Sequence, residues 1–222
     1  MATMTADMRF VPAKPRLRGV LHQWAALAAF AAGAVLTAMA PNGKAALGSG
    51  VFAVSLVALF TVSATYHRPT WGPLGRRWMR RLDHAAIFLL IAGTYTPLCL
   101  LALEPSDGSR LLTVVWGAAA LGILQSIMWI DAPKGVTALL GVLVGWSVIP
   151  WFGAVYRALS PVELTLMISG GVLYTAGAVA YASRRPNPKP GVFGYHEVFH
   201  ALTIAAGGLH FALVVLLVKR AG

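Results

Sequence analysis

The chain has 222 residues, of which 58% are hydrophobic and only 11% are charged, and its mean hydropathy is +0.71. These values exclude an ordinary soluble globular protein and indicate an integral membrane protein. The formal net charge is +11, but the basic residues lie in short clusters between apolar segments, so nucleic acid is not an expected partner.

The first element in chain order is a polar and basic segment at residues 1–19. It lacks the apolar core and the small-residue cleavage site of a secretory signal peptide. We therefore expect a cytoplasmic N-terminal segment, followed by a membrane domain that spans residues 20–222.

Seven apolar stretches follow, each with about the 20 residues that an α-helix needs to cross a bilayer core of about 30 Å. They are Val20–Ala40, Leu47–Tyr66, His84–Leu103, Leu111–Ile130, Val136–Val155, Glu163–Ala182 and Val192–Val218. Turn-forming sequences such as PNGK and RRPNPKPG separate them. The sequence thus predicts an all-α fold, a bundle of seven transmembrane helices, with bends where Pro97 and Pro150 each remove a helix hydrogen bond.

The distribution of Lys and Arg predicts the orientation of the bundle. Of the 18 basic residues, thirteen fall on the side of the N-terminus and five on the other side. Because cytoplasmic loops hold the excess of Lys and Arg, we expect the N-terminus in the cytoplasm and the C-terminus outside.

A few ionisable residues lie within the predicted helices, where they are costly and therefore point to function. His67, Asp83 and His196 fall at the cytoplasmic edge of the second, third and seventh helices. Helical spacing places Ser63 and His200 one turn deeper, on the same faces. Three imidazoles and a water form an open zinc site, which makes hydroxide available, and Asp83 would hold that water. Manganese or iron could use the same ligands, but three imidazoles with one open position favour zinc.

The remaining histidines are interpreted differently. Histidines near helix ends are common at membrane interfaces, where they are half-hydrated, and we interpret His22 and His84 in this way. His210 lies ten residues beyond His200, about 15 Å along the helix, and is too deep to bind the same ion. It is interpreted as a buried, hydrogen-bonded histidine.

The stretch HEVFH has the His-Glu-x-x-His spacing of zinc proteases, in which the Glu is the base. The common proteases of this type take a third ligand from a Glu further on, but no acidic residue follows Glu197. The extended protease motif would need Gly and His where the chain has Thr203 and Ala206. We therefore expect His67 to supply the third ligand, and Glu197 to orient a neighbour or to face the headgroups.

Four ordered motifs, KPRLRGVLH, SATYH, RLDHAAIFLLIAGTYTP and HEVFHALTIAAGGLHF, make the chain similar to the hemolysin III proteins. These are bacterial members of the progestin and adipoQ receptor superfamily, and the resemblance extends from about Lys14 to the end. It implies seven helices in the bacterial cell membrane with the N-terminus inside, zinc ligands at His67, His196 and His200, and Ser63 and Asp83 near the metal-bound water. The alkaline ceramidases, which are more distant relatives, suggest hydrolysis of a lipid amide.

Three functions follow as hypotheses. The first is a zinc-dependent hydrolase of a lipid amide or ester, with Asp83 as the base, Ser63 positioning the water or the oxyanion, and an acyl-chain-bearing membrane lipid as the substrate. The second is a sensor of membrane lipid state with structural zinc. The third is the pore-forming cytolysin that the family name implies. Ionisable residues gathered at one face fit a pocket better than a monomeric channel, whereas an oligomeric pore stays open as an alternative.

Overall fold

A computed structural model describes residues 14–222, so residues 1–13 of the predicted N-terminal segment, which spans residues 1–19, lie outside the described part. The described part consists of α-helices and one short 3₁₀ helix. They are α1 Val20–Ala38, α2 Gly43–His67, α3 Pro73–Leu101, α4 Pro105–Met128, α5 Lys134–Gly145, η1 Ile149–Trp151, α6 Phe152–Ala158, α7 Pro161–Ser183 and α8 Tyr195–Arg220. Seven of the described segments are long and apolar enough to cross a membrane, which confirms the predicted fold class.

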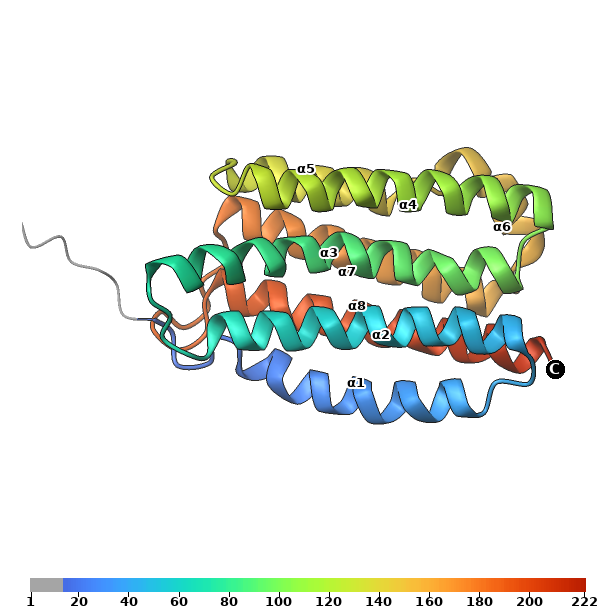
Figure 1. Cartoon of the computed structure of the whole chain (residues 1–222), viewed down its shortest axis with the longest axis horizontal. Coiled ribbons are helices and arrows are strands. Elements are labelled where there is room, and N and C mark those ends of the chain that lie inside the picture. The colour runs from blue at the N-terminus through green and yellow to red at the C-terminus, as the bar shows by residue number, and fades with distance from the viewer. Residues whose placement is uncertain (1–13) are drawn as a thin grey trace, which may run out of the picture.

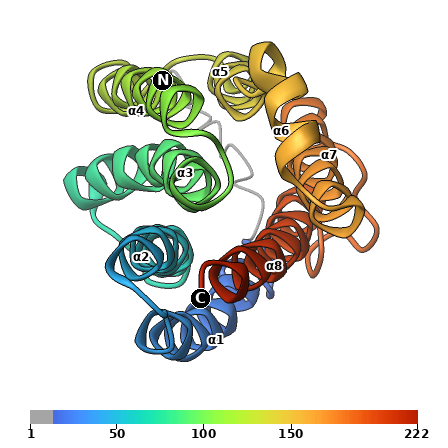
Figure 2. The same cartoon turned by 90° about the vertical axis from the view of Figure 1, so that its right-hand side faces the viewer.

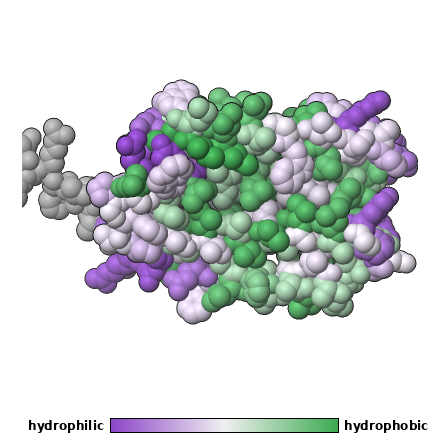
Figure 3. Space-filling model, viewed as in Figure 1, coloured by the Kyte–Doolittle hydropathy of each residue, from purple (hydrophilic) through white to green (hydrophobic). Residues whose placement is uncertain are grey.

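The helices run along the long axis of the molecule (Figure 1). Seen from one end, they form a circuit in chain order, and α8 returns to lie beside α1 (Figure 2). Hydrophilic residues gather towards the two ends of the bundle, and hydrophobic residues dominate the middle (Figure 3). Large apolar side chains such as Trp24, Phe30 and Leu121 face outwards, as expected for surfaces that contact lipid.

The third span begins earlier than predicted. The apolar stretch starts at His84, but α3 starts eleven residues before it, at Pro73. Proline is favoured in the first turn of a helix because it has no N–H to leave unpaired. Hydropathy locates where a helix enters the apolar layer, whereas hydrogen bonding decides where the helix begins. The first turns of α3 therefore carry a cluster of arginines.

The fifth span is broken, whereas the third continues through its proline. α5 ends at Gly145, and η1 and α6 follow around Pro150, while Pro97 lies inside an uninterrupted α3. Tyr95 of α3 stabilises the break in the fifth span. Its hydroxyl donates to the carbonyl of Gly145 (2.6 Å) and accepts from the N–H of Val148 (3.1 Å). A side chain thus satisfies backbone groups that the break leaves without a helical partner.

The first turn of α2 contacts the end of α8 at one end of the molecule. Asn42 caps α2 by accepting from the N–H of Ala45 (3.0 Å), and its amide nitrogen donates to the carbonyl of Ala221 (2.9 Å). The loop between α1 and α2 is therefore joined to the end of α8.

Candidate metal centre

Three histidines from two helices meet inside the bundle. His67 is the last residue of α2, and His196 and His200 lie one turn apart at the start of α8. All three are buried, with exposed fractions of 7%, 8% and 2%. Their donor nitrogens lie within 4.8 Å of one another, and the Nε2 atoms of His67 and His196 are 3.0 Å apart. The structure thus brings together the three residues that the sequence predicted as ligands.

The spacing of these nitrogens fits a metal ion. Zinc–nitrogen bonds are about 2.0–2.1 Å long, so two ligands of a tetrahedral zinc ion lie about 3.3 Å apart. The 3.0 Å between His67 and His196 is close to this value. His200 completes a buried group with three donors, so the group can hold a metal ion.

The segment before α1 holds the first turn of α8 in place. Arg18 donates to the Oε1 atom of Glu197, and Glu197 Oε2 accepts from the N–H of Gly194 (2.8 Å). The backbone N–H groups of Arg16 and Leu17 donate to the carbonyls at 191 and 192 (3.1 and 3.3 Å). Glu197 is fully buried. It caps the helix that carries two of the histidines, which agrees with an orienting role and not with a position among the headgroups.

Gly19 allows the start of α1 to approach the histidine group closely. Its φ of 80° lies in the left-handed region that glycine adopts without strain. A Cβ atom at this position would lie 2.7 Å from Cβ of His67. Any larger residue would therefore push the N-terminal segment away from α2.

Asp83 and Ser63 lie beside the histidines. Oδ2 of Asp83 is 3.8 Å from Nε2 of His67, and the Asp83 side chain is 13% exposed. Ser63 is buried and hydrogen-bonds the carboxylate of Asp83. Helices α2 and α3 thus place a hydroxyl and a carboxylate next to a nitrogen that would bind the metal ion.

The other three histidines, His22, His84 and His210, lie outside the group of three donors. His22 is buried, and its ring stacks on that of His200 with centroids 3.8 Å apart and planes 7° apart, so the interfacial interpretation of His22 is wrong. It still stands outside the group of three donors. His84 lines the cavity described below. Nε2 of His210 bonds the carbonyl of Met167 (3.1 Å), which confirms a buried, hydrogen-bonded histidine.

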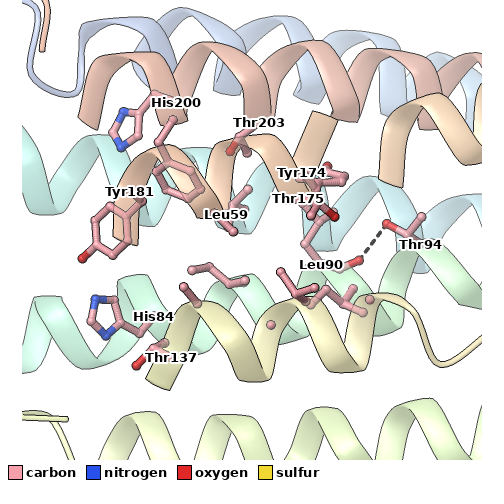
Figure 4. Close-up of a pocket in the computed structure, with 18 of the residues that line it drawn as sticks. Leu59, His84, Leu90, Thr94, Thr137, Tyr174, Thr175, Tyr181, His200 and Thr203 are labelled. Carbon is pink, nitrogen blue, oxygen red and sulfur yellow. Dashed lines mark hydrogen bonds between the residues drawn. The ribbon is translucent and has the colours of Figure 1, made fainter. Parts of the chain in front are cut away.

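A large cavity extends from the histidine group into the bundle. It contains about 1190 Å³ of empty space, its open mouth included, and its lining comes from every long helix except α4. Most lining side chains are apolar or aromatic. His200, Tyr181 and His84 lie at one end, and Tyr174, Thr175 and Thr94 lie towards the other (Figure 4). Sequence reasoning missed the tyrosines and threonines of this lining.

Basic side chains gather at the end of the bundle that holds the three histidines. Lys14 donates to the carbonyl of Arg68 (3.2 Å). Burial, followed by the charges of Arg18, Arg68 and Arg76, lowers the pKa of the Lys14 ammonium. Such a surface attracts anionic lipid headgroups.

Known proteins are similar to this chain over most of its length. The family model described as haemolysin-III related matches residues 10–211. Hemolysin-3 of Bacillus cereus is 29% identical over 168 residues, which cover 76% of this chain and 74% of that protein. The Hemolysin-3 homolog of Bacillus subtilis (strain 168) is 28% identical over 165 residues, 74% of each chain. Heptahelical transmembrane protein ADIPOR2 of Oryza sativa subsp. japonica is 30% identical over 190 residues, 76% of this chain and 81% of that protein.

Proposed function

The chain belongs to the haemolysin III-related family of the progestin and adipoQ receptor superfamily, and from this premise we propose that it is a zinc-dependent membrane hydrolase of a lipid amide or ester. One observation carries the proposal. Two of the histidine donors, a carboxylate and a hydroxyl line one end of a mostly apolar cavity inside a membrane bundle, and the third donor, His67, lies beside them. The bacterial cell membrane is the proposed location.

The three histidines, His67, His196 and His200, would hold the ion. Zinc with three imidazoles and an open position supplies a Lewis acid that polarises a carbonyl and acidifies water. The Asp83 carboxylate accepts the proton of the attacking water and returns it to the leaving group, as a general base and then a general acid. Ser63 donates to Asp83 and fixes its orientation. The apolar lining takes the acyl chain and excludes bulk water from the carbonyl.

A second candidate is a lipid sensor in which the ion has a structural role. The observation in its favour is the packing around the donors. His22 covers one face of the His200 ring, and the Arg18–Glu197 pair fixes the first turn of α8. Such packing suits an ion that is held permanently and exchanges no ligand.

The two candidates differ in turnover. Purified protein in vesicles should contain about one zinc ion per chain and hydrolyse at least one member of a panel of ceramides, N-acyl lipids and acyl esters. A chelator should remove the activity, and added zinc should restore it. If folded, zinc-loaded protein hydrolyses no member of the panel, the enzyme proposal fails and the sensor stands.

A further inference from the structure

The cavity continues past the metal group to a second set of polar side chains. Thr203 and His210 of α8 line it three and ten residues beyond His200, and Tyr174 of α7 lines it opposite them. Spacings of three, four and seven residues keep side chains on one helix face. The face of α8 that carries two of the metal donors therefore also carries this deeper set.

Each residue of this set has one buried polar atom without a hydrogen-bond partner among the described residues. Tyr174 Oη, Thr203 Oγ1 and His210 Nδ1 are buried and bond no group of the described residues. Thr203 is 4% exposed and His210 is 8% exposed. Buried polar atoms in proteins are nearly always hydrogen-bonded, because leaving one without a partner is costly. Three such atoms on one cavity point to a ligand that bonds them.

The hydrogen-bonding pattern defines the chemistry of that ligand. A carbonyl oxygen only accepts, so the bond between His210 Nε2 and Met167 O requires the proton on Nε2. In the neutral ring, Nδ1 then accepts. Tyr174 and Thr203 each carry a hydroxyl that can donate. An aliphatic hydroxyl group satisfies both sides, because it accepts from Tyr174 or Thr203 and donates to His210, whereas a ketone can only accept.

Gly170 makes the close packing of this set possible, and Gly207 also lies against it. A Cβ atom at Gly170 would lie 2.3 Å from Nε2 of His210, so only glycine allows the ring to sit against α7. A Cβ atom at Gly207 would lie 3.5 Å from Oη of Tyr174. The tyrosine hydroxyl thus approaches the backbone of α8 on the turn between the threonine and the histidine.

We propose that Tyr174, Thr203 and His210 form a second subsite, which binds a hydroxyl group carried partway along the chain of a lipid ligand. The position along the chain rests on the proposed function, because it assumes that the carbonyl end of the ligand lies at the metal group. The subsite lies about 5–15 Å beyond His200 along α8. Carbon–carbon bonds of about 1.5 Å advance an extended chain by about 1.3 Å per carbon, so the hydroxyl belongs about four to twelve carbons from the carbonyl.

Binding of matched fatty acids tests this subsite without turnover. We expect the purified full chain in nanodiscs to bind 10-hydroxyoctadecanoic acid about tenfold more tightly than octadecanoic acid in calorimetric titrations. The double variant Tyr174→Phe/Thr203→Val should lose most of this preference and keep its affinity for octadecanoic acid. Thr94→Val is the matched control. Thr94 lines the same cavity, but its hydroxyl already donates to the carbonyl of Leu90 (2.8 Å, Figure 4), so the preference should stay.

Several results would overturn the subsite. Equal affinity of the parent protein for the two acids, a preference that survives in the double variant, or no binding of either acid would each do so. Ordered water would then be the partner of the three atoms. The 10-oxo acid should bind more weakly than the hydroxy acid, and equal binding would overturn the assignment of His210 as an acceptor. Failure of the proposed function is distinguishable, since it would appear as zinc-loaded protein that binds the hydroxy acid selectively and hydrolyses no lipid.

Discussion

The substitution Asp83→Asn separates a catalyst from a sensor, because it removes a base while it keeps the size of the side chain. The Asp83 carboxylate lies 3.8 Å from Nε2 of His67 and bonds Ser63. The asparagine amide oxygen can still accept from the serine hydroxyl, and the metal donors are untouched. We therefore expect the variant to fold and to retain zinc.

The expected loss of turnover is large. A positioned base contributes about 10²- to 10⁴-fold, which is about 3–5 kcal/mol of activation free energy. Ser63→Ala should cost less, about 10- to 100-fold, because it removes one hydrogen bond to a charged group and leaves the carboxylate in place. Both rates are measured on the best lipid of the panel, alongside zinc content and thermal unfolding.

Asp131→Asn is the matched control for the chemical change. Asp131 is 80% exposed, lies 3.6 Å from an Arg80 nitrogen and is not one of the candidate metal donors. The Asp131→Asn protein should keep the full hydrolytic activity of the parent protein. An active, zinc-loaded Asp83→Asn protein would refute the assignment of Asp83 as the base. A structural zinc ion predicts instead no hydrolysis by the parent protein and a lower unfolding temperature for the Asp83 variant.

Three further predictions concern the metal, the orientation and the ion pair. Substituting alanine for any one of the three donor histidines should abolish zinc binding in elemental analysis, because the two remaining donors hold the ion too weakly. The control variant His210→Gln should retain zinc. A donor variant that still contains zinc would contradict the proposed metal site. The donors are His67, His196 and His200. A reporter fused after Gly222 should read as external and one in the 68–81 region as cytoplasmic, and identical signals would contradict the predicted orientation. Arg18→Leu should destabilise the protein by about 3 kcal/mol in thermal unfolding, because it leaves the buried Glu197 carboxylate without its cation. Adding Glu197→Gln should recover part of this loss, and an unchanged unfolding temperature in the single variant would argue against the pair.

Features encoded by local spacing were predictable from the sequence. Seven apolar stretches of bilayer length gave the fold class, and the four-residue spacing of His196 and His200 placed two donors on one helix face. The third donor, His67, was found because it ends an apolar stretch at the same level. Each of these signals depends on helix geometry, which is the same in any context.

Features that depend on contacts between distant segments were not predictable. Arg18 and Glu197 are 179 residues apart in the chain, and nothing local to either residue indicates the other. The stacking of His22 on His200 likewise requires α1 and α8 to lie side by side. The set around His210 is an intermediate case. Its helical spacing from His200 was visible, but the unpartnered state of its atoms depends on how α7 packs.

The contacts between the two ends of the circuit bear on the order of events during biosynthesis. His67 and His196 are 129 residues apart, so the donors cannot meet until the ribosome has delivered the last helix to the membrane. The Arg18–Glu197 pair and the Asn42–Ala221 bond also need that helix, one at each end of the bundle. A nascent chain that stops before α8 has a single donor of the three and cannot bind zinc at this group. The group could therefore hold a metal ion only after α8 has been synthesised and has packed against α2.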